Sequence, residues 1–297
     1  MKERVLITGA NGSLARKLGN YFEDKGLEVV FLSTTVAESR DKIYYWDPPS
    51  NQIDLSAFDN CSYIVHLCGY SILKPWTKKS KKLMYDSRVL TSLFLLKKCQ
   101  EINLHIKAFI TASAIGYYGM DACGVKYELD DCGKDWLSKL CYDWEMAAES
   151  FRSISDRVIK LRISLLIDPS SGFLYFTKSV LRKGIAPVFG NGKSFIEWIH
   201  IDDAVRFIFY AIRNPKVIGP YNLASPNKTT HYEFIKILRK HVNRYSIIIF
   251  LPEFFLKIFL REKSRLIIYN YQLSSEKMLS SGYRFKFLSS KDLINPS

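Results

Sequence analysis

The sequence predicts an α/β protein with a doubly wound parallel sheet and a smaller mixed lobe at its C-terminal side. Three observations point to this class. A glycine turn near the start of the chain joins an apolar strand to a helix, short apolar runs then alternate with longer helical segments, and the pattern changes near residues 169–172. Such alternation predicts parallel strands, because each crossover needs a long connection. We therefore expect a nucleotide-binding domain at 1–165 and a lobe at 166–297, with part of 195–225 returning to the first domain.

The first element is the glycine turn. Residues 4–15 read Arg-Val-Leu-Ile-Thr-Gly-Ala-Asn-Gly-Ser-Leu-Ala, an apolar strand that runs into a helix beginning near Leu14. Gly9 and Gly12 let the backbone turn sharply and approach a pyrophosphate at the helix N-terminus, and the small Ala15 keeps helix and strand close. This context predicts a Rossmann-type dinucleotide site; the alternative is a tight loop that binds nothing. The predicted contacts are Gly9, Asn11, Gly12, Ser13 and Leu14.

Short apolar runs predict the other strands of the sheet. They lie at residues 28–32, 63–67, 108–112 and 158–166, and the segments between them are long enough for crossovers. Helical periodicity is present at 80–103 and 135–153. Strands of this kind are covered on both faces and bind ligands at their carboxyl ends, so the residues that follow each strand are the candidates for a site.

The second lobe begins after the loop at 169–172. Helices are predicted there at 173–183, 203–214, 232–242 and 253–260, with a loop at 189–192 and a strand at 195–201. The apolar stretch 247–260 is interrupted by Pro252, Glu253 and Lys257. Because it is also shorter than the roughly 20 residues that span a bilayer, a strand followed by a short helix is the better interpretation.

The formal net charge of +14 is unevenly distributed. Residues 227–297 contain thirteen Lys and Arg against five Asp and Glu. Such a bias is typical of a solvated face, an acidic ligand, an anionic surface or a nucleic-acid site. No nucleic-acid module accompanies the charge, so we expect no nucleic-acid partner and no stable membrane insertion. A protein partner or an anionic surface at the basic C-terminal lobe stays open.

The cysteines are widely spaced: Cys61, Cys68, Cys99, Cys123, Cys132 and Cys141. None forms a Cys-x-x-Cys pair, so the sequence predicts neither a metal site nor a disulfide framework. The chain runs from Met1-Lys2-Glu3-Arg4 into the first strand without the features of a signal peptide. We therefore expect a cytoplasmic protein with reduced thiols.

Six further motifs occur in order: Trp46-Asp47-Pro48, His66-Leu67-Cys68-Gly69, Asp86 to Leu90, Ser113 to Gly119, Trp198 to Asp203 and Ser281 to Phe285. With the glycine turn, they resemble the extended short-chain dehydrogenase/reductase superfamily, which contains nucleotide-sugar epimerases and dehydratases. Within it, the chain is similar to an atypical epimerase-like subfamily. The resemblance runs nearly end to end and implies a nucleotide-binding domain with a substrate lobe.

The end of the second predicted strand favours NADP over NAD. An acidic residue there would bind the ribose hydroxyls of NAD, whereas a basic one tolerates the additional phosphate of NADP. Ser33 and Thr34 carry no charge, Ser33 can donate to a phosphate, and Arg16 and Arg40 are near in sequence. The resemblance also implies NADP, although the subfamily usually has Arg where this chain has Thr34.

Residues after the third core strand complete the predicted cofactor site. Leu67, Cys68 and Gly69 are expected to flank the adenosine side of the cofactor. Arg88 is expected to reach the cofactor from the following helix; the alternative is a cation on the helix surface. The lysine-rich stretch 74–82 either closes over an anionic substrate or starts a solvated helix.

The resemblance also shows a departure in the chemistry. Oxidoreductases of this superfamily use a Tyr, acidified by a Lys four residues later, for proton transfer. Aligning Glu145 with the Glu that commonly lies in that helix puts Leu137 and Cys141 at these two positions, and neither can do this work. The candidate catalytic residues that remain near the expected nicotinamide are Ser113, Tyr117 and Tyr118. Either tyrosine could donate a proton or simply line the pocket.

His200, Asp202 and Asp203 resemble a catalytic cluster, but a structural role explains them more simply: an Asp caps the helix from Ala204 and the His anchors a returning strand.

Our first hypothesis is an NADP-binding, epimerase-family oxidoreductase acting on an unidentified carbonyl or hydroxyl substrate. The alternative is a dinucleotide-binding regulator without proton-transfer machinery, related to division proteins and acting through a partner. A surface binder that depends on the basic tail is the third.

Overall fold

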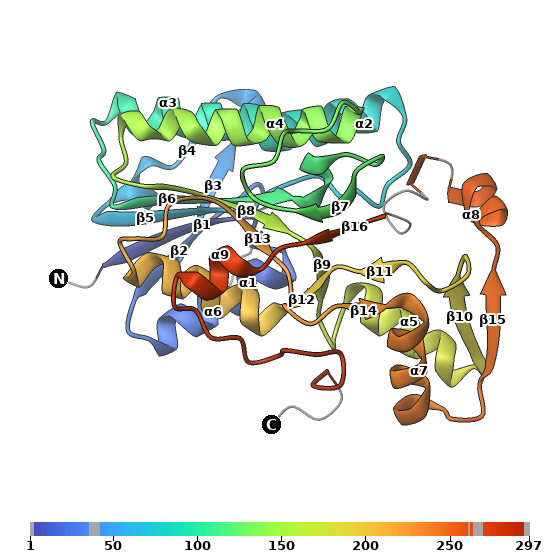
Figure 1. Ribbon diagram of the computed structural model, residues 1–297. Coiled ribbons are helices and arrows are strands. Elements are labelled where there is room, and N and C mark those ends of the chain that lie inside the picture. The colour runs from blue at the N-terminus through green and yellow to red at the C-terminus, as the bar shows by residue number, and fades with distance from the viewer. Residues whose placement is uncertain (1–2, 36–41, 261, 264–269, 294–297) are drawn as a thin grey trace. The chain divides into compact units, whose positions relative to one another are not determined.

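The computed structural model describes residues 3–35, 42–260, 262–263 and 270–293. Its main feature is an eight-stranded sheet with the order β13-β8-β6-β5-β1-β2-β3-β4 (Figure 1). Strands β1, β2, β3, β5 and β6 pair in parallel, and β4 joins β3 antiparallel. The expected doubly wound parallel sheet is therefore confirmed. The strands are β1 Arg4–Thr8, β2 Glu28–Ser33, β3 Ile43–Asp47, β4 Gln52–Ile53, β5 Cys61–His66, β6 Ala108–Ala114, β8 Val158–Ile163 and β13 Gly219–Leu223.

Helices cover both faces of this sheet (Figure 1). Helix α3 and most of α4 lie over one face, and α1 and most of α6 lie over the other. Leu95 and Leu96 of α3 and Phe151 of the turn after α4 belong to one hydrophobic cluster with sheet residues such as Phe109. The helices are α1 Ser13–Asp24, α2 Lys78–Tyr85, α3 Thr91–Glu101, α4 Trp136–Glu149 and α6 Ile201–Arg213; short 3₁₀ turns occupy Pro48–Ser50, Leu55–Phe58, Ile115–Tyr118 and Ser150–Ser153.

Helix α1 forms as its sequence pattern predicts. Its buried residues are Ala15, Leu18, Gly19 and Phe22, a spacing that places them on one face of the helix. A Cβ on Gly19 would lie 2.4 Å from the ring of Phe31, so a glycine here allows α1 to approach β2 closely. The glycine turn is thereby held against the edge of the sheet.

The helix expected at 80–103 is confirmed, but it is α-helical only in part. Helices α2 and α3 are separated by a π-turn at Asp86–Leu90. A π-turn leaves carbonyls without their usual i+4 partners, and here side chains satisfy them. The Thr91 hydroxyl donates to Ser87 O at 2.9 Å, and the Ser92 hydroxyl donates to Arg88 O at 2.6 Å.

The remaining elements are short strands and helices. They are β7 Cys123–Lys126, β9 Leu165–Ile167, α5 Gly172–Arg182, β10 Ile185–Phe189, β11 Phe195–Ile196, β12 Trp198–His200, β14 Thr229–Thr230, α7 His231–Val242, β15 Ile247–Leu251, α8 Glu253–Leu260, β16 Asn270–Leu273 and α9 Glu276–Ser280. The strand followed by a short helix expected at 247–260 is confirmed by β15 and α8.

The chain forms two compact units, each assembled from separate segments. Unit 1 comprises Met1–Ser113, Leu140–Leu161 and Val205–Pro220, and unit 2 comprises Ala114–Lys139, Arg162–Ala204 and Tyr221–Ser297. Unit 2 has its own core, which includes Trp198 and Phe234. The division into domains at 1–165 and 166–297 stays a prediction. Where the chain is described, no helix combines the length and hydrophobicity needed to cross a bilayer.

Candidate functional site

Unit 1 contains a cavity of about 670 Å³ at the carboxyl ends of its strands. Segments that follow β1, β2, β3 and β5 form its walls, together with the π-turn and the start of α3. Ligands of doubly wound sheets bind at this edge. The lining residues are Gly9, Ala10, Asn11, Gly12, Leu32, Ser33, Thr34, Trp46, Asp47, Pro48, Pro49, Leu67, Cys68, Gly69, Tyr70, Lys82, Leu83, Asp86, Ser87, Leu90, Thr91 and Phe94.

The glycine turn forms one wall of the cavity. Gly9 has φ +80°, and a Cβ there would lie 3.1 Å from backbone atoms of Leu67 and Cys68. Gly12 is the N-cap of α1 and has no side chain to cap the helix. The backbone N–H groups in the first turn therefore remain available to an anion. Of the predicted contacts, Gly9, Asn11 and Gly12 line the cavity, whereas Ser13 and Leu14 begin α1 beside it.

The end of β2 reaches the cavity through Ser33 and Thr34, as the sequence predicts. The Ser33 hydroxyl accepts the backbone N–H of Thr35 at 3.1 Å, which fixes the turn after the strand. Thr34 is exposed. Arg16 is also exposed, on α1, and does not line the cavity; Arg40 lies outside the described residues.

A buried hydrogen-bond network shapes the turn after β5. The hydroxyl of Thr8 accepts the N–H groups of Leu67 and Cys68 at 3.0 and 3.2 Å. The same hydroxyl lies 3.0 Å from Nδ1 of His66. This network fixes the predicted residues Leu67, Cys68 and Gly69 at the cavity wall.

The thiol of Cys68, in this part of the cavity wall, lies among polar side chains. Its Sγ lies 3.7 Å from Nε2 of His66 and 3.6 Å from the hydroxyl of Thr91. Burial opposes ionisation, but the charge of His66 and the hydrogen bonds from His66, Thr91 and Thr8 outweigh it, and the pKa of Cys68 falls below its ordinary value.

Arg88 does not line the cavity. Its guanidinium donates to Tyr70 O at 3.0 Å and Met84 O at 3.2 Å, and it lies 5.1 Å from the ring centroid of Trp144. A Cβ on Gly69 would come within 2.9 Å of its Cζ. Burial lowers the pKa of Arg88. Arg88 therefore supports the Gly69 loop from behind, and it is not a surface cation.

The structure adds residues that the sequence reasoning did not assign to the site. Trp46 is 3% exposed and lines the cavity together with the residues that follow it, Asp47, Pro48 and Pro49. Its motif is visible in the sequence as Trp46-Asp47-Pro48. The sequence leaves the lysine-rich stretch 74–82 open between a substrate-closing and a solvated segment; its Lys82 lines the cavity and pairs with Asp86 at 2.5 Å. Leu83 and Leu90 are exposed leucines that also line the cavity.

Ser113, the first of the candidate catalytic residues, is 3% exposed at the end of β6. Its hydroxyl donates to Oε1 of Glu145 at 2.7 Å, and Glu145 is also buried. Both residues belong to unit 1. The hydrogen bond joins the strand end to α4.

Tyr117 and Tyr118 belong to unit 2. The guanidinium of Arg162 lies 3.5 Å from the ring centroid of Tyr117 and donates to the hydroxyl of Tyr118 at 2.9 Å. The Tyr118 hydroxyl donates to Oδ1 of Asn222 at 2.5 Å. Burial raises the pKa of Tyr118 to about 12, so this phenol stays protonated at neutral pH.

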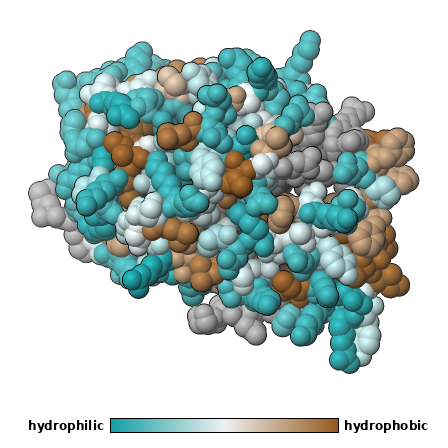
Figure 2. All heavy atoms as spheres, viewed as in Figure 1, coloured by the Kyte–Doolittle hydropathy of each residue, from teal (hydrophilic) through white to brown (hydrophobic). Residues whose placement is uncertain are grey.

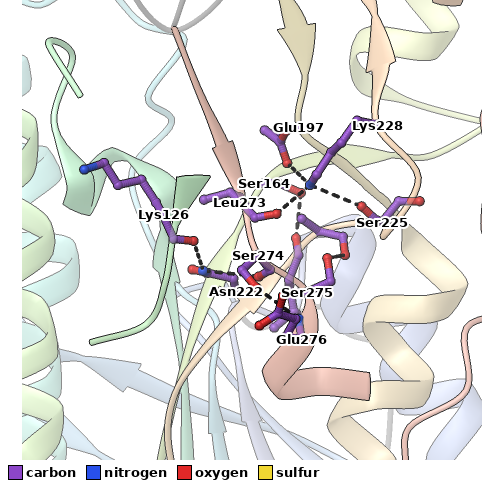
Figure 3. Close-up of polar contacts among 12 residues, drawn as sticks. Lys126, Ser164, Glu197, Asn222, Ser225, Lys228, Leu273, Ser274, Ser275 and Glu276 are labelled. Carbon is purple, nitrogen blue, oxygen red and sulfur yellow. Dashed lines mark hydrogen bonds and ion pairs between the residues drawn. The ribbon is translucent and has the colours of Figure 1, made fainter. Parts of the chain in front are cut away.

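Asn222 extends this polar cluster through unit 2 (Figure 3). Its amide donates to Lys126 O and Ser274 O at 3.2 and 3.4 Å. Nearby, Nζ of Lys228 donates to Glu197 Oε2 at 2.8 Å and to Leu273 O at 2.6 Å (Figure 3). These contacts tie segments far apart in sequence to one another.

Leu137 and Cys141, at the expected Tyr and Lys positions, are 6% and 2% exposed. A Cβ on Gly116 would lie 2.7 Å from a methyl carbon of Leu137, so this leucine packs tightly within unit 2. Neither side chain is the Tyr or Lys that the family resemblance places at these two positions.

His200 and Asp203 have structural roles. Helix α6 begins at Ile201, so Asp203 lies inside its first turn and is not the expected cap. The Asp203 carboxylate accepts from the Tyr283 hydroxyl at 3.0 Å and from the N–H of Phe287 at 2.8 Å. The ring of His200 stacks on Phe287 with centroids 3.6 Å apart. Both anchor the segment near Phe287.

Comparisons with known proteins agree with this geometry. The family model "NAD dependent epimerase/dehydratase family" matches residues 5–224. An Epimerase family protein of Mycobacterium bovis is 31% identical over 241 residues, 81% of this chain and 79% of that protein. One from Staphylococcus haemolyticus is 28% identical over 99% of both chains. The crystal structure of human epimerase family protein SDR39U1 with NADPH aligns with a TM-score of 0.84 at 24% identity, covering 97% and 96% of the two chains. The chain belongs to the NAD dependent epimerase/dehydratase family.

Proposed function

We propose that the protein binds NADP in the unit 1 cavity and acts as an epimerase-family oxidoreductase on a carbonyl or hydroxyl compound. The fit of the glycine turn is the observation that carries this proposal. A Cβ at Gly9 would press on the backbone of the Leu67–Cys68 turn, and the N-terminus of α1 offers free N–H groups. A pyrophosphate is the chemical group that such a cradle accepts.

The preference for NADP rests on the end of β2. At the described end of β2, Ser33 and Thr34 carry hydroxyl groups where the ribose 2′-phosphate is expected in this fold. Lys82 adds a cation elsewhere on the cavity wall. The human relative whose structure contains NADPH has the same fold.

The reaction is a hydride transfer in this proposal. When bound, the nicotinamide supplies or accepts the hydride. The candidate groups for orienting a substrate oxygen remain the Ser113 hydroxyl and the Tyr117 phenol. Ser113 is held by Glu145, which fixes the orientation of its hydroxyl. Tyr118 is less suited to proton transfer. Burial raises its pKa to about 12, and its hydroxyl already donates a hydrogen bond to Oδ1 of Asn222.

A second candidate function is a dinucleotide-binding regulator that acts through a protein partner. The apolar, buried side chains of Leu137 and Cys141 favour it, because they stand where proton transfer is expected in the family. This candidate requires the same cofactor site but no turnover.

We also propose a cytoplasmic location, which the six unbridged thiols support.

The first experiment is calorimetric titration of the purified protein with NADPH and NADH. We expect tighter binding of NADPH and loss of binding in Gly9→Ala and Gly12→Val. Gly26→Ala is the matched control, because Gly26 shares φ +80° with Gly9 but has open space around its Cβ position. No binding of either cofactor, or equal loss in all three variants, would contradict the proposal.

Turnover separates the two candidate functions. NADPH oxidation is followed with a panel of carbonyl compounds in the wild type, Ser113→Ala and Tyr117→Phe. An enzyme oxidises NADPH with at least one compound, and one of the two substitutions slows it. A regulator binds NADPH but oxidises none of it with the panel. It also retains a partner protein in a pull-down, and the amount retained changes in Gly12→Val.

A further inference from the structure

The two-stranded sheet of unit 2 has one covered and one uncovered face. Strands β10 and β15 pair in parallel, with Ile185 opposite Ile247 and Pro187 opposite Ile249. Between them, Ala186 and Val188 are fully buried in the unit 2 core. Side chains alternate along a strand, so Ile185, Ile247 and Ile249 lie on the face opposite to the core.

This outer face is entirely apolar. Ile247 is 69% exposed, and Ile185 and Ile249 are about 40% exposed. A solvated sheet face normally carries polar side chains at these positions. The sequence Ile-Ile-Ile-Phe-Leu of β15 therefore exposes apolar groups that the described residues leave uncovered.

Helix α8 continues the same exposed apolar surface. It begins one residue after β15, separated only by Pro252. Phe254, Phe255 and Ile258 are each more than half exposed. Figure 2 shows hydrophobic residues gathered where β15 and α8 lie in Figure 1. We call Ile185, Ile247, Ile249, Phe254, Phe255 and Ile258 the apolar face.

Cations border the apolar face at one end of the sheet. Arg182, the last residue of α5, and Lys183 lie just before the start of β10 at Ile185, and Arg244 lies three residues before the start of β15 at Ile247. The amide of Asn243 donates to Leu181 O at 3.2 Å, which holds these two turns together. All three cations are exposed. Residues 172–189 and 241–260 contain five Lys and Arg against one Glu.

An aromatic side chain lies at the same boundary. Tyr245, between Arg244 and β15, is 76% exposed, and the guanidinium of Arg244 donates to its hydroxyl. Tyrosine favours the interface between water and lipid, where its ring is in an apolar layer and its hydroxyl is hydrated. Basic residues beside exposed Phe and Ile are typical of surfaces that lie in the headgroup region of a membrane.

We propose that the apolar face and its bordering cations bind reversibly to the surface of an anionic lipid bilayer. The Phe and Ile side chains would enter the boundary between headgroups and acyl chains, and Arg182, Lys183 and Arg244 would contact lipid phosphates. The surface binds as a folded unit without crossing the bilayer. This binding uses residues of unit 2 alone and does not depend on the cofactor cavity.

The experiment is flotation of the purified full chain with vesicles of phosphatidylcholine alone and of phosphatidylcholine mixed with phosphatidylglycerol. We expect the chain to float with the anionic vesicles and not with the neutral ones. Raising the salt shortens the screening length from about 10 Å at 0.1 M to about 3 Å at 1 M and should reduce binding. No flotation with anionic vesicles would overturn the proposal.

Substitutions test the surface itself. Ile247→Ser and Phe254→Ser should each weaken vesicle partitioning by roughly tenfold, since each removes one buried apolar side chain. The double charge-reversal variant with Arg182→Glu and Lys183→Glu should abolish the preference for anionic vesicles. Leu129→Ser and Lys216→Glu change exposed residues elsewhere and should bind normally. Circular dichroism melting checks that each variant is folded.

Two results would reassign the apolar face. If every apolar-face variant floated like the wild type, lipid would bind elsewhere and the proposal would fail. If sedimentation showed a dimer that Ile247→Ser converts to a monomer, the occupant of this face would be a second copy of the chain. A monomer that loses only vesicle binding is the expected result.

Discussion

The buried pair of Glu197 and Lys228 offers a test of how unit 2 is held together. The carboxylate of Glu197 is 1% exposed and accepts from Lys228 Nζ at 2.8 Å. The same ammonium group donates to Leu273 O at 2.6 Å (Figure 3). Lys228→Met removes the charge and both hydrogen bonds but retains most of the volume of the side chain. We expect this substitution to destabilise the protein strongly.

The magnitude follows from the burial of the two partners. Removing one member of a buried ion pair costs about 3–5 kcal/mol, because the remaining charge stays in the interior. The side chain of Lys228 is 21% exposed, so water can reach the site and the lower value, about 3 kcal/mol, applies. For a chain of this size such a loss corresponds to a drop of roughly 6–12 °C in melting temperature.

The loss should also depend on pH. Burial raises the pKa of Glu197 above its ordinary value, and the charge of Lys228 opposes that rise. A group with a raised folded pKa contributes stability that is present below the unfolded pKa and lost as pH rises through the folded pKa. Without Lys228 the pKa rises further. The deficit of Lys228→Met should therefore be larger at about pH 8 than at about pH 5.

Thermal and urea unfolding of three variants checks this reasoning. Lys42→Met is the matched control, because Lys42 pairs with Glu23 at the same 2.8 Å but both side chains are exposed. Exposed pairs contribute less than about 1 kcal/mol. The double variant Glu197→Gln, Lys228→Met should recover part of the loss. Equal effects of Lys228→Met and Lys42→Met would refute the argument from burial.

Three further predictions concern the cavity and its surroundings. Thr34→Asp should weaken NADPH binding at least about tenfold relative to NADH by charge repulsion, whereas Asn20→Asp on the exposed side of α1 should not; calorimetry measures both. Bound NADPH should slow alkylation of Cys68 about tenfold or more at saturation, but not that of exposed Cys123, as peptide mass spectrometry will show. Tyr118→Phe should lower the free energy of unfolding by about 1–3 kcal/mol, because the buried side chains of Asn222 and Arg162 each lose a partner; an unchanged urea midpoint would contradict this.

Much of unit 1 could be predicted from the sequence because its signals are local. The glycine turn lies between an apolar strand and a helix, and both neighbours are visible in the residues that form them. The core strands are continuous apolar runs, as expected for strands buried on both faces. Gly9, Gly12 and Ser33 follow such strands and do line the cavity.

The part of the cavity wall formed by α2, the π-turn and α3 depends on contacts that a sequence does not display. Apolar spacing over 80–103 predicts one helix, and the π-turn within it contains no Gly or Pro that would mark it in the sequence. Arg88 was expected at the cofactor, but carbonyls of Tyr70 and Met84 hold it behind Gly69. The exposed isoleucines of β15 are likewise indistinguishable from buried ones in sequence alone.

The π-turn at Asp86–Leu90 makes the cavity sensitive to chain length as well as to residue identity. An α-helix turns by about 100° per residue, so deleting one residue there would let α2 and α3 merge and rotate α2 about its axis. Lys82 and Leu83 would then leave the cavity wall, although every side chain of the site would still be present in the sequence. During divergence, a single-codon deletion would therefore remove these side chains from the cavity wall in one step. Conservative replacements of the same residues would leave them in place.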